Sequence, residues 1–236
     1  MKEGKIHLIP VPLSDGNIDQ LSVSSVQKAR EIAYFLAEKS KSARQFIKLI
    51  QHPLKQAEIE VREMEEGISK EDMEWVTELC RKGIQVAIVS EAGVPCVADP
   101  GNKIVLYAHQ NKIEVLSYAG PNSMIMALMA SGLNGQQFQF HGYLPRKKEE
   151  LKEKFIQLGK SCQQNISSQI FMETPYRNIQ IMQMAIAVLP SNLFLSVSLS
   201  LGTKDQKSIT LIIKDWKNQN LDFIKDKPAV YVIGKG

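Results

Sequence analysis

The run IQVAIV at residues 84–89 constrains the fold most, because its last four residues are apolar without alternation. Such a run is typical of a strand that is buried on both faces of a parallel sheet. The segment before it, residues 69–83, predicts a helix: Ser69 can cap it, and apolar residues recur there at helical spacing. Further elements predicted in this half are strands at 6–9 and 113–118 and helices at 25–40, 102–112 and 122–132. Strands alternating with helices predict an α/β fold with a mainly parallel sheet.

After about residue 120 the chain holds several strands with fewer helices between them. This pattern is typical of a mixed sheet in an α+β domain. We therefore predict two domains, an N-terminal α/β domain at 1–118 and a C-terminal α+β domain at 119–236. The elements expected in the second domain are strands at 137–145, 168–174, 192–201, 207–215 and 228–235 and helices at 148–160 and 176–189.

Composition excludes several classes of protein. The 236 residues contain no apolar run near the roughly 20 residues that a membrane span needs, and no signal-peptide core, so we expect a cytoplasmic protein. The three cysteines and four histidines are scattered, which predicts neither a disulfide framework nor a metal site. The chain lacks GxGxxG, GxxxxGK[ST] and GxSxG motifs, which disfavours Rossmann dehydrogenases, P-loop enzymes and α/β-hydrolases.

The loop SEAGVPCVADPG at residues 90–101 follows the buried strand and combines glycines and prolines with two acidic residues. In open parallel sheets, ligands bind outside the carboxyl ends of the strands. Glycine lets a ligand approach the backbone closely, and proline stiffens the loop. Similar turns follow three other predicted strands, at 9–12, 118–123 and 172–177. We expect the four turns to converge on one crevice; the alternative is that they only end strands.

Four segments carry a resemblance to a known family. VSEAGVPCVADPG (89–101) resembles VSDAGTPLISDPG, AGPNSMIMALMASGL (119–133) resembles PGPSAAITALSASGL, HGYLPRKKEE (141–150) resembles EGFLPRKKGE, and FMETPYRN (171–178) resembles FYESPHRL. These are signatures of the bacterial ribosomal RNA small subunit 2′-O-methyltransferase I family. That family belongs to the tetrapyrrole methylase superfamily, the class III S-adenosylmethionine-dependent methyltransferases.

The resemblance implies two α/β domains of the tetrapyrrole-methylase type, with S-adenosylmethionine in the cleft between them, and a homodimer. It also assigns cofactor-binding positions to the four turns. These are Pro10 in the first turn, Glu91, Ala92, Gly93, Val94 and Pro95 in the second, Ala119, Gly120, Pro121, Asn122 and Ser123 in the third, and Phe171 and Met172 in the fourth.

Three segments depart from the family pattern. PVPLSDGNIDQ stands where the family has PTPIGNLED, and LAEKSKSAR keeps Glu38 of the AEDTR motif but loses its Asp-Thr-Arg. The RELTK segment appears as SLGTK, so Ser200 and Leu201 replace Arg-Glu. These changes point to a paralogue with a different target or with reduced activity.

A ribose hydroxyl is a weak nucleophile, so its methylation needs alignment and benefits from a general base. Glu91 is the candidate catalytic residue; the alternative is that its carboxylate holds a neighbouring backbone amide. For Asp99 and Glu173 we favour structural roles: Asp99 capping the helix that starts near Asn102, and Glu173 pairing with Arg177.

The run Arg146, Lys147 and Lys148 is the candidate RNA-binding segment, since basic side chains contact phosphates. The alternative is a solvated helix start. The net charge of +4 is compatible with either. Three functions stay open: methylation of small-subunit ribosomal RNA at a 2′-hydroxyl, methylation of a tetrapyrrole-like or other small molecule, and RNA or ribosome binding with weak or no turnover.

Overall fold

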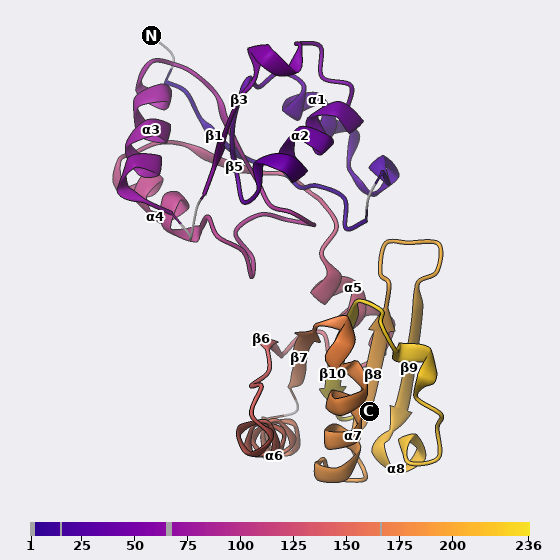
Figure 1. The fold of residues 1–236 in the computed structure, drawn as a ribbon. Coiled ribbons are helices and arrows are strands. Elements are labelled where there is room, and N and C mark those ends of the chain that lie inside the picture. Colours follow the sequence, from indigo (N-terminus) through magenta and orange to yellow (C-terminus); the bar gives the residue numbers. More distant parts are fainter. Residues whose placement is uncertain (1–2, 15, 65–67, 166) are drawn as a thin grey trace. The chain divides into compact units, whose positions relative to one another are not determined.

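The computed structural model describes residues 3–14, 16–64, 68–165 and 167–236 (Figure 1). The chain divides into two compact units, 1–122 and 123–236, each described by itself below. The boundary predicted after residue 118 stays a prediction. None of the described helices is long and apolar enough to cross a membrane.

Unit 1 is built on a five-stranded sheet of order β3-β2-β4-β1-β5, in which every neighbouring pair is parallel. All five strands therefore end at the same edge of the sheet. The strands are β1 (Ile6–Leu8), β2 (Tyr34–Ala37), β3 (Glu60–Glu63), β4 (Val86–Val89) and β5 (Val115–Ser117).

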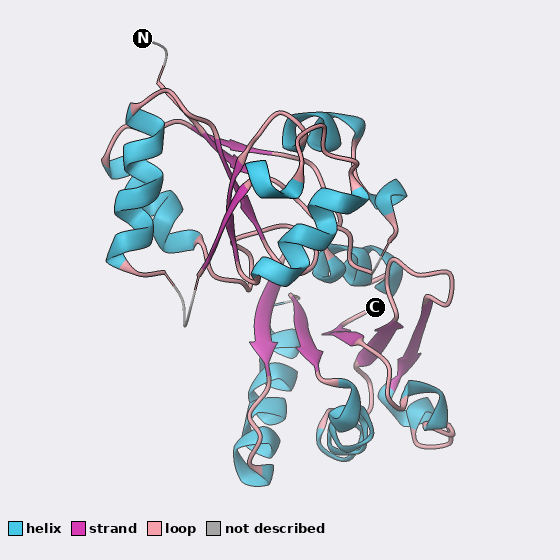
Figure 2. Cartoon of the chain, turned by 45° about the horizontal axis from the view of Figure 1, so that its top comes forward, coloured by secondary structure: helices cyan, strands magenta, loops and turns pink. Residues whose placement is uncertain are grey.

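Helices cover both faces of this sheet (Figure 2). One face packs against α1 (Val23–Ala29) and α2 (Ser40–Leu49), and the other against α3 (Lys70–Arg81) and α4 (Asn102–Gln110). Because both faces are covered, all four residues of β4 are buried, as its uninterrupted apolar run predicts. Two short 3-10 helices, Ile18–Gln20 and Gln56–Glu58, complete the unit.

Unit 2 contains a mixed five-stranded sheet of order β6-β7-β10-β8-β9, where β6 and β7 are parallel and the other pairs are antiparallel. Helices α6 and α7 pack on one face around a large apolar core, and α5 packs on the other. The elements are α5 (Ser123–Ser131), β6 (Phe138–Tyr143), α6 (Lys148–Asn165), β7 (Ser168–Glu173), α7 (Asn178–Val188), β8 (Phe194–Leu199), β9 (Lys207–Ile212), α8 (Ile213–Trp216) and β10 (Ala229–Gly234), with 3-10 turns at Pro175–Arg177 and Asp222–Ile224.

The predicted α/β fold with a parallel and a mixed sheet is confirmed, but the single helix predicted at 25–40 is wrong. Helix α1 ends at Ala29, and the second half of the segment is strand β2. The run YFLA lies between β3 and β4, and its last three residues are buried. A short apolar run of this kind cannot be distinguished from a buried helix turn by periodicity, so tertiary pairing decides it. No element is predicted from the sequence at the positions of α2 and β3.

Candidate functional site

The turns at 9–12 and 90–101, and the third turn as far as Asn122, lie together in unit 1, because they follow the adjacent strands β1, β4 and β5. Ser123, the last residue of the third turn, is the first residue of unit 2. The turn at 9–12 and the turn at 90–101 are joined by a pair of backbone hydrogen bonds. Val11 N–H donates to Gly93 O at 2.9 Å, and Gly93 N–H donates to Val11 O at 3.1 Å. The third is anchored from α1, where Ser25 Oγ donates to Ala119 O at 2.9 Å. The three turns therefore form one connected surface at the carboxyl edge of the sheet.

Two glycines permit this close packing. Gly120 leaves so little room that a Cβ there would lie 2.1 Å from Pro10 Cβ. Gly93 has φ of +76°, and a Cβ there would lie 3.0 Å from the carbonyl oxygen of Pro121. Gly120 thus packs against the ring of Pro10, and Gly93 against the backbone of the third turn; a larger residue at either position would require a shift.

The loop between β4 and α4 holds strained backbone as well. Cys96 and Ala98 have φ of +68° and +66°, in the left-handed region that non-glycine residues rarely adopt. Such residues cost on the order of 1–3 kcal/mol each and occur preferentially at ligand clamps and active sites. The loop is thus held in a shape that its own residues disfavour.

A buried histidine, not anticipated from the sequence, supports the third turn. His7 Nε2 lies 2.8 Å from Gln85 Oε1, and Nδ1 lies 3.0 Å from the Tyr118 hydroxyl. Because the Gln85 oxygen can only accept, Nε2 carries the proton and Nδ1 accepts from Tyr118. Burial lowers the pKa of His7, in agreement with this neutral form. The histidine thereby fixes the residue that directly precedes Ala119.

Three carboxylates surround the start of the second turn. Glu91 accepts a hydrogen bond from Ser42 Oγ at 3.2 Å, and its own backbone N–H donates to Glu38 Oε2 at 3.1 Å. Burial, with added repulsion from Glu38 and Glu91, raises the pKa of Asp99 to about 7. The capping role predicted for Asp99 is wrong: Gly101 is the N-cap of α4, and no side chain in the described part of the chain caps that helix.

A pocket of about 560 Å³ opens beside Glu91, one of its lining residues. Its walls come from α2, from the segment after β1 and from the first two residues of the second turn, all within unit 1. Sequence analysis missed it, because α2 was not assigned. Its lining includes Val11, Gln45, Phe46, Gln51, Ser90 and Glu91.

The fourth turn, 172–177, belongs to unit 2, so the convergence of all four turns stays a prediction. The ring of Phe171 is fully buried and stacks on Tyr231 at a centroid distance of 4.9 Å. Phe171 therefore has only its backbone to offer a ligand. Met172 is half-buried against the α5 side of the sheet.

The ion pair expected between Glu173 and Arg177 is confirmed, with Arg177 Nη1 3.0 Å from Glu173 Oε2 and both side chains buried. The same guanidinium donates to the carbonyl oxygens of Leu144 at 3.3 Å and Pro145 at 2.8 Å. Arg177 thereby fixes the residues that directly precede the basic run.

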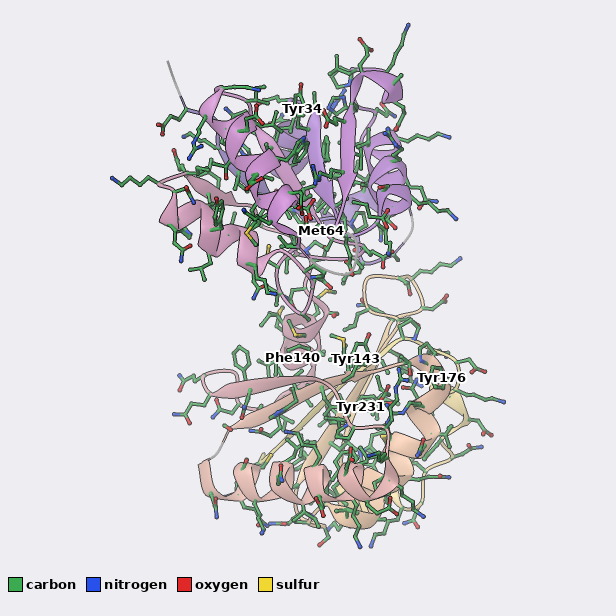
Figure 3. The ribbon with its side chains drawn as sticks, turned by 60° about the vertical axis from the view of Figure 1, so that its left-hand side comes forward. Tyr34, Met64, Phe140, Tyr143, Tyr176 and Tyr231 are labelled. Atoms are coloured by element: carbon green, nitrogen blue, oxygen red, sulfur yellow. The ribbon has the colours of Figure 1, made fainter. Side chains whose placement is uncertain are left out.

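The basic run itself is exposed, and Lys147 forms an ion pair with Glu150 at 3.0 Å. Two tyrosines stand near it: Tyr143, the last residue of β6, is 61% exposed, and Tyr176 is 70% exposed (Figure 3). Because β6 and β7 are parallel, both tyrosines lie at the same edge of the sheet. Exposed aromatic rings beside cations are typical of surfaces that bind single-stranded RNA. Their exposure was not readable from the sequence.

Comparisons with known proteins show the family of this chain. The family model "Tetrapyrrole (Corrin/Porphyrin) Methylases" matches residues 5–214. The chain is 30% identical to "Ribosomal RNA small subunit methyltransferase I" of Thermotoga maritima over 174 residues, which are 74% of this chain and 73% of that protein. The protein of the same name from Streptococcus pyogenes serotype M6 is 31% identical over 174 residues, 74% of this chain and 57% of that protein. The chain thus spans little more than half of this second relative.

Two solved structures share the fold. The uroporphyrin-III-C-methyltransferase from Thermus thermophilus superposes with a TM-score of 0.57 at 17% identity, covering 100% of this chain and 93% of that one. The methyltransferase CobJ gives a TM-score of 0.64 at 12% identity, covering 99% and 95%. The chain belongs to the tetrapyrrole (corrin/porphyrin) methylase family of S-adenosylmethionine-dependent methyltransferases.

Proposed function

We propose that this protein binds S-adenosylmethionine at the three connected turns of unit 1 and transfers its methyl group to a ribose 2′-hydroxyl of small-subunit ribosomal RNA. The observation that carries the proposal is the connected surface formed by Pro10, Gly93 and Gly120 at the carboxyl edge of the parallel sheet. This is the edge where open α/β sheets bind ligands.

The residues present fit such a cofactor. Ala92 and Ala119 are exposed and small, so their turns offer backbone groups to the amino, carboxylate and hydroxyl groups of the cofactor. The sulfonium is a cation, and the carboxylates of Glu38 and Glu91 lie at the start of the second turn, where Glu38 Oε2 accepts a hydrogen bond from the Glu91 backbone N–H. Negative charge near a sulfonium favours its binding.

S-adenosylmethionine supplies the methyl group when bound, and the protein supplies alignment and proton acceptance. Rigid turns hold the reacting groups in line, and such orientation can lower the barrier by several kcal/mol. We assign to Glu91 the role of accepting a hydrogen bond, and finally the proton, from the ribose hydroxyl. Its carboxylate is exposed and accepts a hydrogen bond from Ser42 Oγ, so it is accessible to an acceptor.

RNA is the proposed acceptor for two reasons. Arg146, Lys147 and Lys148 are exposed next to Tyr143 and Tyr176, a combination that suits phosphates and unstacked bases. The relatives with 30–31% identity are named for small-subunit ribosomal RNA. We also propose the homodimeric state that the family resemblance implies and the cytoplasmic location that the composition predicts. Methylation of a tetrapyrrole-like small molecule is the second candidate, favoured by the fold of the two structural neighbours.

Methyl transfer tests the function directly. Small ribosomal subunits from a strain lacking this protein should incorporate radiolabelled methyl groups from S-adenosylmethionine. RNA with a 2′-deoxy residue at the mapped position should bind without accepting a methyl group. Methylation of the deoxy substrate would exclude the ribose as acceptor. Transfer to a tetrapyrrole but not to RNA would support the second candidate, and cofactor binding without any transfer would indicate an RNA-binding paralogue.

Salt dependence tests the RNA surface. Replacing Arg146, Lys147 and Lys148 with alanine should flatten the salt dependence of RNA affinity by about three phosphate contacts and leave cofactor binding intact. A control variant with the same loss of charge replaces the exposed Lys214, Lys217 and Lys225 of the same unit. If RNA affinity depended on salt concentration equally in the two variants, the basic run would be only a solvated helix start and not an RNA-binding segment.

A further inference from the structure

We infer that the pocket between α2 and the segment after β1 receives one unpaired nucleobase of the RNA substrate. The inference rests on the proposed function and names where the acceptor nucleotide sits. The pocket volume of about 560 Å³ lies in the range of small-ligand sites, and it is large enough for a nucleoside-sized group.

The chemistry of the walls matches a base. Val11 and Phe46 are 4% exposed and supply apolar surface for a planar ring. Gln45 and Gln51 are exposed at the pocket, and their amides can both donate and accept hydrogen bonds. Enzymes that act on one nucleotide commonly hold the extruded base this way, with apolar contacts to its faces and hydrogen bonds to its edge.

The charges of the walls disfavour other occupants. Among the described lining residues, Lys48 is the one cation and Glu91 the one anion, so the pocket is close to neutral. A macrocycle with several carboxylates would bring more negative charge than the single lysine among the described residues of the pocket can balance. A neutral base needs no cation, and its phosphates would remain outside the pocket.

The position of the pocket links it to the proposed reaction. Ser90 and Glu91 line it and lead directly into the turn assigned to the cofactor. Val11 also lines it, and the same residue exchanges two backbone hydrogen bonds with Gly93. A base held here therefore contacts the turn that carries Glu91, which brings its own ribose to the candidate proton acceptor.

Substitution at the exposed Gln45 tests the assignment without touching the cofactor turns. Gln45→Trp fills the pocket, and Gln27→Trp, at an exposed position of α1 outside the pocket, is the matched control. We expect kcat/KM for methyl transfer to small ribosomal subunits to fall at least tenfold in Gln45→Trp only. Affinity for S-adenosylhomocysteine and the melting temperature should match the wild type in both variants.

Crosslinking supplies a readout independent of activity. The photoreactive residue p-benzoylphenylalanine at position 45 should crosslink to small-subunit ribosomal RNA at the methylated nucleotide, and at position 27 it should not. Unchanged kcat/KM in Gln45→Trp, or a crosslink elsewhere in the RNA, would refute the placement of a nucleobase in this pocket. Methyl transfer by the wild type would still support the proposed function. If the wild type transfers no methyl group, the proposed function is refuted. Crosslinking at position 45 then decides by itself whether the pocket holds a base.

Discussion

Replacing Gly120 with alanine should separate two turns that now touch. The added Cβ would lie 2.1 Å from Pro10 Cβ and 2.4 Å from Pro10 Cγ, whereas real Cβ contacts essentially never fall under 3.0 Å. The proline ring is rigid, so the turns must move apart by about 1 Å. Overpacking of this kind costs about 1–3 kcal/mol of unfolding free energy. Misplacement of binding groups by about 1 Å should weaken S-adenosylhomocysteine binding on the order of 10- to 100-fold.

Calorimetric titration measures the affinity, and denaturant unfolding measures the stability. Gly132→Ala is the control, because Gly132 has φ of +71° but no described atom within 4 Å of its Cβ position. That variant should lose about 1 kcal/mol of stability from the left-handed backbone alone and keep its affinity. Wild-type affinity and stability in Gly120→Ala would refute both the close contact and the assignment of this turn to the cofactor.

Three further predictions concern single residues. Gly93→Val should abolish cofactor binding while circular dichroism shows the fold retained, because a β-branched residue disfavours φ of +76°; undiminished binding would place the cofactor elsewhere. The pKa of Asp99 is raised to about 7, so the protonated side chain contributes stability below pH 4 that is lost as pH rises towards 7. Asp99→Asn should therefore raise the melting temperature more at pH 8 than at pH 4, and an equal shift at both would contradict the raised pKa. Arg177→Ala should cost about 3–5 kcal/mol of unfolding free energy, because it leaves the Glu173 carboxylate buried without its cation. A loss below 1 kcal/mol in urea unfolding would show that the carboxylate finds another partner.

Strong local signals explain what was predictable in the fold. The helix at Lys70–Arg81 begins with a Ser69 cap that accepts from Asp72 N–H, so its start is encoded within four residues. The buried strand Val86–Val89 is equally explicit, since its composition suits burial on both faces. The segment YFLA carried no such signal, and its pairing with β3 and β4 made it a strand.

The family motifs, the turns at the strand ends and elements with strong local signals, such as the helix at Lys70–Arg81 and the strand at Val86–Val89, could be read from the chain alone, because they depend on residues that are neighbours in the sequence. Only the tertiary structure decided which turns touch, since Pro10 meets Gly120 and Val11 meets Gly93 across long sequence separations. It also decided the state of Asp99, whose pKa reflects burial and the approach of Glu91 from the same loop and of Glu38 from the end of β2. The pocket beside Glu91 exists only because the parallel sheet brings α2 alongside the turns after β1 and β4, and no local pattern encodes a space between separate segments.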